Sequence, residues 1–208
     1  YFRARVFMRK NVIQSLESIC SEIRYRTIEL SHFAKTPHLG SSLSCIDILV
    51  SLYWQILRID SKKPNCSERD RFILSKGHAA LPLYVLLAKK GFFSKNILMS
   101  YNKPGSCLAE HPGPNCVPGI EAATGSLGHG LPIGVGMALA AKASLKKYRV
   151  FVVMSDGECN EGSNWEAAMM APAHGLDNLV VIIDFNKWQA TGRSEEIFSL
   201  TPLREKWE

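Results

Sequence analysis

Long hydrophobic runs are absent from this sequence, which excludes an obvious membrane-spanning segment. Apolar runs such as Leu179–Ile183 are far shorter than the roughly 20 residues that a spanning helix needs. The N-terminus is basic, with Arg3, Arg5 and Arg9, but no apolar stretch of signal-peptide length follows it. Hydrophobic residues make up 46% and charged residues 21% of the 208-residue chain, a composition typical of an ordinary globular protein.

Several motifs that would define a function are also missing. The six cysteines include no C-x-x-C pair, which argues against a zinc site and indicates reduced thiols in a cytoplasmic protein. The chain has no G-x-x-x-x-G-K-[ST] loop, no H-E-x-x-H and no G-x-S-x-G. Gly134 and Gly136 begin a dinucleotide-like pattern, but Leu139 stands where the third glycine is required.

The charge pattern gives no basic stripe. Lys and Arg outnumber Asp and Glu, giving a net charge of +6, but they are scattered along the chain. Nucleic acid is therefore not expected as a partner. A solvated surface and an attraction for the phosphates of a sugar or cofactor both fit this charge.

We expect one domain over residues 1–208, incomplete at its C-terminus, with residues 1–10 as a disordered or non-native lead. Met8 is a plausible start. Segment 70–74 is short and mixed, and residues 102–119 are rich in Pro and Gly, which indicates a long ordered loop or lid. Pro37 and Gly40 are expected to break the first helix. Helices are predicted over 12–34, 44–57, 79–90, 131–147 and 164–174, and buried strands over 149–154 and 179–183.

The two predicted strands and the helix between them form a β-α-β unit. Such units build an α/β fold, here an open, mostly parallel sheet with helices on both faces. Asp156 follows the first strand and Asn186 the second, so both are expected at the carboxyl edge of the sheet, where ligands bind.

The chemistry of these two side chains suits a hard cation. A carboxylate and an amide oxygen favour Mg²⁺ or Ca²⁺ over zinc, and Mg²⁺ commonly takes backbone, water and phosphate oxygens as its further ligands. Gly157 permits close backbone approach, and a helix start near 161–164 offers amide donors to phosphate. These residues alone fit either a metal-diphosphate site or a capped helix with Asn186 in a turn.

The same region resembles a known family. Asp156-Gly157-Glu158, followed by Phe185-Asn186, resembles the thiamine-diphosphate motif, with Ser155 and Phe185 in place of its first Gly and first Asn. Neither departure removes a metal ligand. Four further segments resemble the transketolase family in particular: 36–41, 75–79, 125–131 and 158–167.

The resemblance implies roles for matching residues. Mg²⁺, or else Ca²⁺ or Mn²⁺, would be held by Asp156, Asn186 and the carbonyl of Trp188. His38, His78 and His129 would face the reacting sugar, and Glu161 would join a carboxylate network near a subunit interface. His111, in the long loop, is left open between a sugar-channel role and turn chemistry. Contacts to thiamine diphosphate would come from Ser41, His78, Gly125, Ser126, Leu127, Asp156, Gly157, Glu158, Asn186 and Trp188.

The resemblance also implies an activity and a partner. The activity would be transfer of a two-carbon ketol unit between sugar phosphates, as in pentose phosphate metabolism, with this chain supplying the diphosphate and metal half of the site. A pyrimidine-domain subunit would supply the other half, in a dimer of such pairs. The alternatives are a non-catalytic cofactor-binding scaffold or regulatory subunit, and another thiamine enzyme such as 1-deoxyxylulose-5-phosphate synthase.

Overall fold

A three-stranded parallel sheet divides the described residues into two groups of helices. The computed structural model describes the backbone of residues 2–208 and the side chains of residues 11–208. The strands are β1 (Arg71–Leu74), β2 (Val150–Ser155) and β3 (Leu179–Asp184), in the order β1-β2-β3. Val153 of β2 is in register with Leu74 and with Ile182, and both pairings are parallel. The predicted α/β fold is confirmed.

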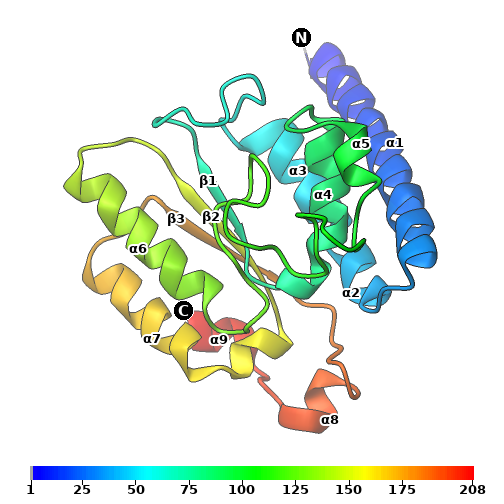
Figure 1. Cartoon of the computed structure of the whole chain (residues 1–208). Coiled ribbons are helices and arrows are strands. Elements are labelled where there is room, and N and C mark those ends of the chain that lie inside the picture. The colour runs from blue at the N-terminus through cyan, green and yellow to red at the C-terminus, as the bar shows by residue number, and fades with distance from the viewer. Residues whose placement is uncertain (1) are drawn as a thin grey trace.

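Strand β2 shows why helices cover both faces of the sheet. Phe151 and Val153 belong to one buried cluster, whereas Val150, Val152 and Met154 belong to the other. This alternation follows from the two-residue period of a strand. Since both sets are apolar, each face must be covered. Figure 1 shows α1, α3 and α4 on one side of the sheet and α6 and α7 on the other.

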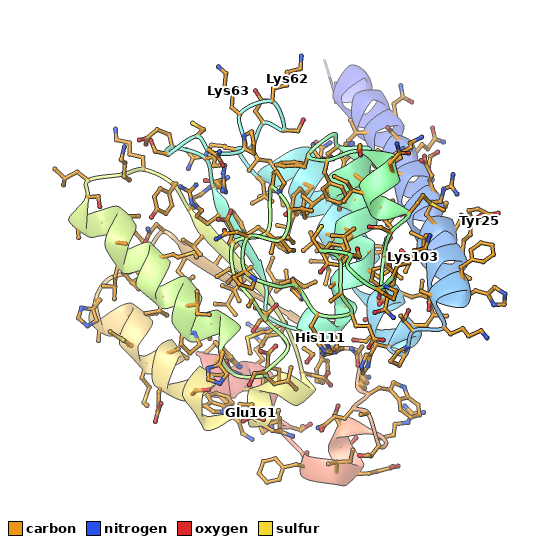
Figure 2. The ribbon with its side chains drawn as sticks, viewed as in Figure 1. Tyr25, Lys62, Lys63, Lys103, His111 and Glu161 are labelled. Carbon is orange, nitrogen blue, oxygen red and sulfur yellow. The ribbon has the colours of Figure 1, made fainter. Side chains whose placement is uncertain are left out.

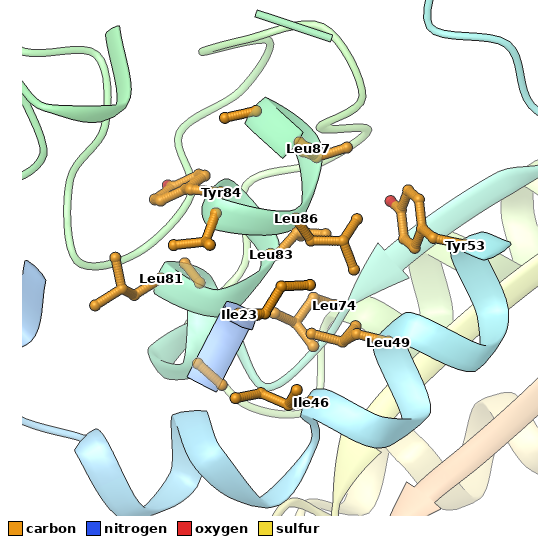
Figure 3. Close-up of a cluster of buried hydrophobic side chains, with 14 of the residues drawn as sticks. Ile23, Ile46, Leu49, Tyr53, Leu74, Leu81, Leu83, Tyr84, Leu86 and Leu87 are labelled. Carbon is orange, nitrogen blue, oxygen red and sulfur yellow. The ribbon is translucent and has the colours of Figure 1, made fainter. Parts of the chain in front are cut away.

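The first cluster joins the N-terminal helices to the sheet. It contains residues of α1 (Phe2–Ala34), α3 (Ile46–Ser51), α4 (Ala80–Lys89) and β1. Ile23, Leu49 and Leu86 meet in the middle of this core (Figure 3), each at most 1% exposed. Full burial of such a side chain stabilises the fold by roughly 1.5–3 kcal/mol.

The second cluster lies under α6 (Gly130–Ala143) and α7 (Gly162–Ala173). Gly134 is required here because a Cβ on it would lie 2.6 Å from Cγ2 of Val152. The glycine therefore lets α6 approach the sheet, which gives Gly134 a packing role. The short helix α9 (Leu203–Trp207) places the Trp207 ring 5.4 Å from the Trp165 ring.

Several sequence predictions are corrected. The mixed segment 70–74 contains strand β1, in which Arg71 is the only polar residue and Phe72–Leu74 are buried. Strand β3 is only partly buried, with Val180 37% exposed, because it has a strand neighbour on one side only among the described residues. Gly40 lies inside α2 (Leu39–Ser44) and does not break a helix. The predicted helix 44–57 begins after Cys45, as α3, and ends in the π-helical turn η1 (Leu52–Ile56).

The predicted loop, the predicted N-terminal lead and the short helical elements complete the description of the fold. Residues 102–119 contain no helix or strand, as predicted for a long loop. The expected lead at 1–10 lies largely outside the residues whose side chains are described, although α1 begins at Phe2. The remaining elements are short: η2 (Gly77–Ala79), α5 (Lys95–Leu98), η3 (Gly157–Asn160) and α8 (Ser194–Phe198).

One stretch of the described chain, Leu39–Ile56, is long and apolar enough to pass a composition test for a membrane span. Its backbone is interrupted at Cys45, between α2 and α3. Ile46 and Leu49 of this stretch belong to the first buried cluster. The apolar character of the stretch is therefore explained by core packing.

At the amino ends of the strands, a buried carboxylate joins three segments. The side chain of Asp70 is fully buried and accepts hydrogen bonds from Arg58 and Arg149, with Nη distances of 2.9 and 2.6 Å. The backbone N–H groups of the same two arginines also donate to it, each at 2.9 Å. Burial by itself would raise the pKa of Asp70, but the hydrogen bonds from Arg149 and Arg58 prevail and lower the pKa to about 2.

We predict that Asp70→Asn destabilises the fold by about 3 kcal/mol, because it leaves two arginines without their buried counter-charge. The folded pKa lies below the ordinary value of 3.8, so Asp70 contributes its stability above that pH and loses it as the pH falls toward 2. Urea unfolding measures both effects. Asp177→Asn, at a side chain 87% exposed, is the matched control and should change little. Equal unfolding midpoints for the two variants would contradict the stabilising role predicted for the Asp70 carboxylate.

Candidate functional site

Asp156 and Asn186 lie at the same edge of the sheet. Strands β2 and β3 end side by side, with Ser155 in register with Asp184, and each predicted ligand follows one or two residues later. The backbone N–H of Lys187 donates to Oδ2 of Asp156 at 3.1 Å. The sequence-based prediction of a shared carboxyl edge is therefore confirmed.

The carboxylate of Asp156 has one satisfied oxygen and one without a partner. Oδ2 accepts from the Ser194 hydroxyl at 2.8 Å and from Lys187 N–H. Oδ1 is buried and has no hydrogen-bond partner among the described residues, although Asp156 is only 1% exposed. A buried carboxylate oxygen without a donor is costly unless a cation or donor binds it. This atom therefore fits a metal ligand.

The side-chain amide of Asn186 is held in one orientation by contacts at both of its ends. Its Oδ1 accepts from the backbone N–H of Trp188 at 2.8 Å, and its Nδ2 lies 3.4 Å from Oδ2 of Asp184. Lys187, between Asn186 and Trp188 in the sequence, has a positive φ of 66°, an uncommon conformation for a residue other than glycine. The described residues contain no group of three His, Cys, Asp or Glu side chains that could hold a metal. A cation here would need amide, backbone and external oxygens as well, a set that suits Mg²⁺.

A buried ion pair lies directly beneath this edge. The side chain of Lys76 is fully buried, and its Nζ lies 2.5 Å from Oδ2 of Asp184. The same ammonium donates to the carbonyl oxygen of Ser41 at 3.0 Å, and the Ser44 hydroxyl donates to Asp184 at 2.6 Å. The pair connects the loop after β1, helix α2 and the end of β3. Sequence patterns gave no sign of this pairing, because its members are far apart along the chain.

Glu158 makes buried side-chain contacts that its sequence motif did not reveal. The residue is fully buried, and its carboxylate accepts hydrogen bonds from the Ser75 hydroxyl and, at 3.1 Å, from Gly128 N–H. Burial raises its pKa, and those hydrogen bonds act in the opposite direction. Glu158 thus ties the loop after β1 to the loop before α6, and its role at a diphosphate remains a prediction.

Three histidines gather beside these loops. The His38 ring lies 5.4 Å from the His78 ring and 6.0 Å from the His111 ring, measured between centroids. His38 stands before α2 with a φ of 67°, and His78 lies in η2. Strained backbone at a non-glycine residue is often found at functional sites. The geometry therefore places His111 in the same cluster, although its sequence motif had left its role open.

The glycine-rich loop 125–130 lies against this cluster. A Cβ on Gly125, whose φ is +130°, would lie 2.4 Å from Cδ2 of His111. A Cβ on Gly77 would lie 2.5 Å from the carbonyl of Thr124. Both glycines are needed because backbone and imidazole approach closely here. Gly125, the first of the three predicted cofactor residues Gly125, Ser126 and Leu127, thus lies against the histidine cluster.

The remaining predicted residues lie around the same region. His129 is exposed at the start of α6, outside the ring contacts of the other three. Glu161 is exposed at the start of α7, and a Cβ on Gly128 would lie 2.7 Å from its Cβ. Figure 2 shows His111 and Glu161 toward the same end of the molecule. Trp188 is 55% exposed, with the Arg193 guanidinium 4.5 Å from its ring centroid.

A parallel sheet with oxygen-bearing side chains at its carboxyl edge, beside a histidine cluster, defines an α/β domain of the kind that binds a ligand at that edge. Residues 15–207 match the family model described as the transketolase thiamine diphosphate binding domain. The chain belongs to the transketolase family.

Relatives and solved structures agree with this assignment. The chain is 46% identical to an apulose-4-phosphate transketolase subunit of Phocaeicola vulgatus, over 94% of this chain and 69% of that protein. It is 39% identical to human transketolase, over 84% of this chain but 28% of that protein. The crystal structure of transketolase from Campylobacter jejuni superposes with a TM-score of 0.87 at 30% identity, over 93% of this chain and 32% of that one. The chain spans less than a third of the human and Campylobacter transketolases.

We predict that His78 is neutral at neutral pH in the protein without bound ligands. Burial is the main cause that lowers its pKa to about 4, and the positive charge of Lys76 adds to the effect. The ring should therefore accept a proton only as the pH falls toward that value. ¹⁵N NMR of the imidazole nitrogens, assigned with His78→Ala, measures the midpoint. A titration midpoint at the ordinary value of about 6.5 would contradict the prediction that burial and Lys76 lower the pKa of His78.

Proposed function

We propose that this chain supplies the diphosphate- and metal-binding half of a transketolase-type active site. The observation that carries the proposal is the buried, partnerless Oδ1 of Asp156 beside the oriented amide of Asn186 among the described residues. Both belong to the segment that resembles the thiamine-diphosphate motif, and family membership supports that cofactor. The activity proposed is transfer of a two-carbon ketol unit between sugar phosphates.

The metal proposed is Mg²⁺. Asp156, Asn186 and the backbone carbonyl of Trp188 would be its protein ligands, and water and phosphate oxygens would complete the coordination. Ca²⁺ and Mn²⁺ accept the same oxygen donors. The positive charge of the metal would offset the negative charge of a diphosphate, which the Asp156 carboxylate alone would repel. Gly157, near the metal ligands, would let the backbone approach that group.

The cofactor proposed is thiamine diphosphate. When bound, it supplies an electron sink for cleavage of a carbon–carbon bond. Ser41, His78 and Glu158 would lie toward its diphosphate and thiazolium side. The loop at 125–127 would hold its ring region, because Gly125 brings backbone close to the histidine cluster.

The histidines would serve the sugar substrate. His38, His78 and His129 would bind its hydroxyl groups, and the contact between the His38 and His111 rings supports the same role for His111. A neutral imidazole can accept a proton from a hydroxyl or donate its N–H to an oxygen. The lowered pKa of His78 favours the neutral form, so this ring would orient the substrate chiefly through hydrogen bonds.

The partner proposed is a pyrimidine-domain subunit, in a dimer of such pairs. The relatives from Phocaeicola vulgatus and Actinobacillus succinogenes are each named as one subunit of an apulose-4-phosphate transketolase, which supports a divided enzyme. Glu161 is exposed beside the glycine-rich loop, where a partner's carboxylate network could reach it. A cytoplasmic location is part of the same proposal.

We predict that Asp156→Ala abolishes binding of thiamine diphosphate in the presence of Mg²⁺. The change removes the buried carboxylate that would hold the metal. Without the metal, the negative charge of the diphosphate would be left uncompensated. Titration calorimetry measures the affinity. Asp177→Ala, at an exposed carboxylate, should bind as the unchanged chain does. Near-normal affinity in Asp156→Ala would exclude the metal assignment.

We also predict that the isolated 208-residue chain transfers no ketol unit when thiamine diphosphate, Mg²⁺ and sugar phosphates are supplied. A cofactor held on its diphosphate side alone would stay hydrated, and water weakens the electrostatic stabilisation that the reaction needs. A coupled assay measures transfer between a ketose phosphate and an aldose phosphate. Adding a pyrimidine-domain chain should restore turnover in a concentration-dependent way. Clear turnover by the homogeneous isolated chain would refute the proposed division of the active site between two subunits.

A further inference from the structure

Ser194 contacts the proposed metal ligand from a distant part of the sequence. Its hydroxyl donates to Oδ2 of Asp156 at 2.8 Å, and the residue is only 8% exposed. The two residues are 38 positions apart. A buried hydrogen bond from a hydroxyl to a carboxylate is stronger than one between neutral groups. This contact therefore acts on the orientation of Asp156.

The two oxygens of Asp156 differ because of this contact. Oδ2 accepts both the Ser194 hydroxyl and the Lys187 N–H, whereas Oδ1 has no partner among the described residues. Two donors on one oxygen fix the plane of the carboxylate. The free lone pairs are thus concentrated on Oδ1. Such a carboxylate is prepared to bind a cation through one oxygen only.

The backbone brings Ser194 to this position by folding back on itself after Asn186. Gln189 N–H donates to the carbonyl of Gly192 at 2.8 Å, and Ser194 N–H donates to that of Lys187 at 3.1 Å. Trp188 and Arg193 form an isolated antiparallel bridge, and the Arg193 guanidinium lies over the Trp188 ring. One short hairpin, residues 186–194, thus carries Asn186, the Trp188 carbonyl and Ser194.

We propose that Ser194 is a positioning residue for the metal: its hydroxyl holds Oδ2 of Asp156 and leaves Oδ1 as the ligand atom. This inference rests on the proposed function, since it needs a cation at Asp156. Partners that hydrogen-bond to a ligating carboxylate typically change metal affinity 10- to 100-fold when removed. Ser194 also makes the hairpin and Asp156 one unit, so the ligands on both strands are held together.

The test uses Mn²⁺ as the probe, with thiamine diphosphate present, and counts free Mn²⁺ by electron paramagnetic resonance. Ser194→Ala should weaken Mn²⁺ binding roughly 10- to 100-fold. Ser194→Thr keeps the hydroxyl and should restore affinity close to that of the unchanged chain. Ser199→Ala, at an exposed serine nearby, is the matched control and should bind normally. Thermal unfolding without metal or cofactor measures the stability that Ser194→Ala loses with this hydrogen bond. The weaker Mn²⁺ binding should persist at temperatures well below that unfolding transition, which separates positioning from a general loss of stability.

A second variant covers the case in which Ser194→Ala fails to fold. Ser194→Cys keeps a similar shape but offers only a weak donor, and it should also bind Mn²⁺ more weakly. Normal Mn²⁺ affinity in folded Ser194→Ala or Ser194→Cys, while Asp156→Ala does not bind, would overturn this inference alone. Absence of binding by the unchanged chain would overturn the proposed function and this inference with it.

Discussion

The ion pair between Lys76 and Asp184 is the constraint on which the arrangement of the site depends. Both side chains are buried, and removing one partner of such a pair typically costs about 3–5 kcal/mol because the other charge is left uncompensated. Lys76 comes from the loop that carries His78, and Asp184 ends the strand that leads to Asn186. The Lys76 ammonium also holds the Ser41 carbonyl of α2, next to His38. One pair thus fixes the histidine cluster relative to the proposed metal ligands.

Glu158 adds a second connection at the same edge, between the loop after β1 and the loop before α6. The glycines at 77, 125 and 128 are consequences of this close assembly, because a side chain at any of them would collide with a neighbouring loop or, at 128, with the start of α7. The chemistry proposed here therefore depends on loops held by buried polar contacts above a rigid parallel sheet. Such positioning is what a cofactor site needs, since misplaced groups lose most of their effect.

The parts of the fold that sequence could predict are those with strong local patterns. Val-rich runs identified β2 and β3, and their order along the chain placed Asp156 and Asn186 at one edge. Strand β1 was missed because it is short and begins with Arg71. The partial exposure of β3 was missed because an apolar run does not reveal how many neighbours a strand has. Asp184, Ser194 and the position of His111 depend on contacts between distant segments, which no local pattern encodes. Glu158 was assigned from its motif alone, and its buried contacts were visible only in three dimensions.

We propose that a divalent metal joins Asp156 to the diphosphate of the cofactor. The most direct test is electron–nuclear double resonance on Mn²⁺ bound to the chain with thiamine diphosphate, which detects phosphorus nuclei coupled to the metal. We expect a phosphorus coupling in the unchanged chain and its loss in Asp156→Ala. Bound Mn²⁺ without phosphorus coupling, or the same coupling in Asp156→Ala, would contradict it.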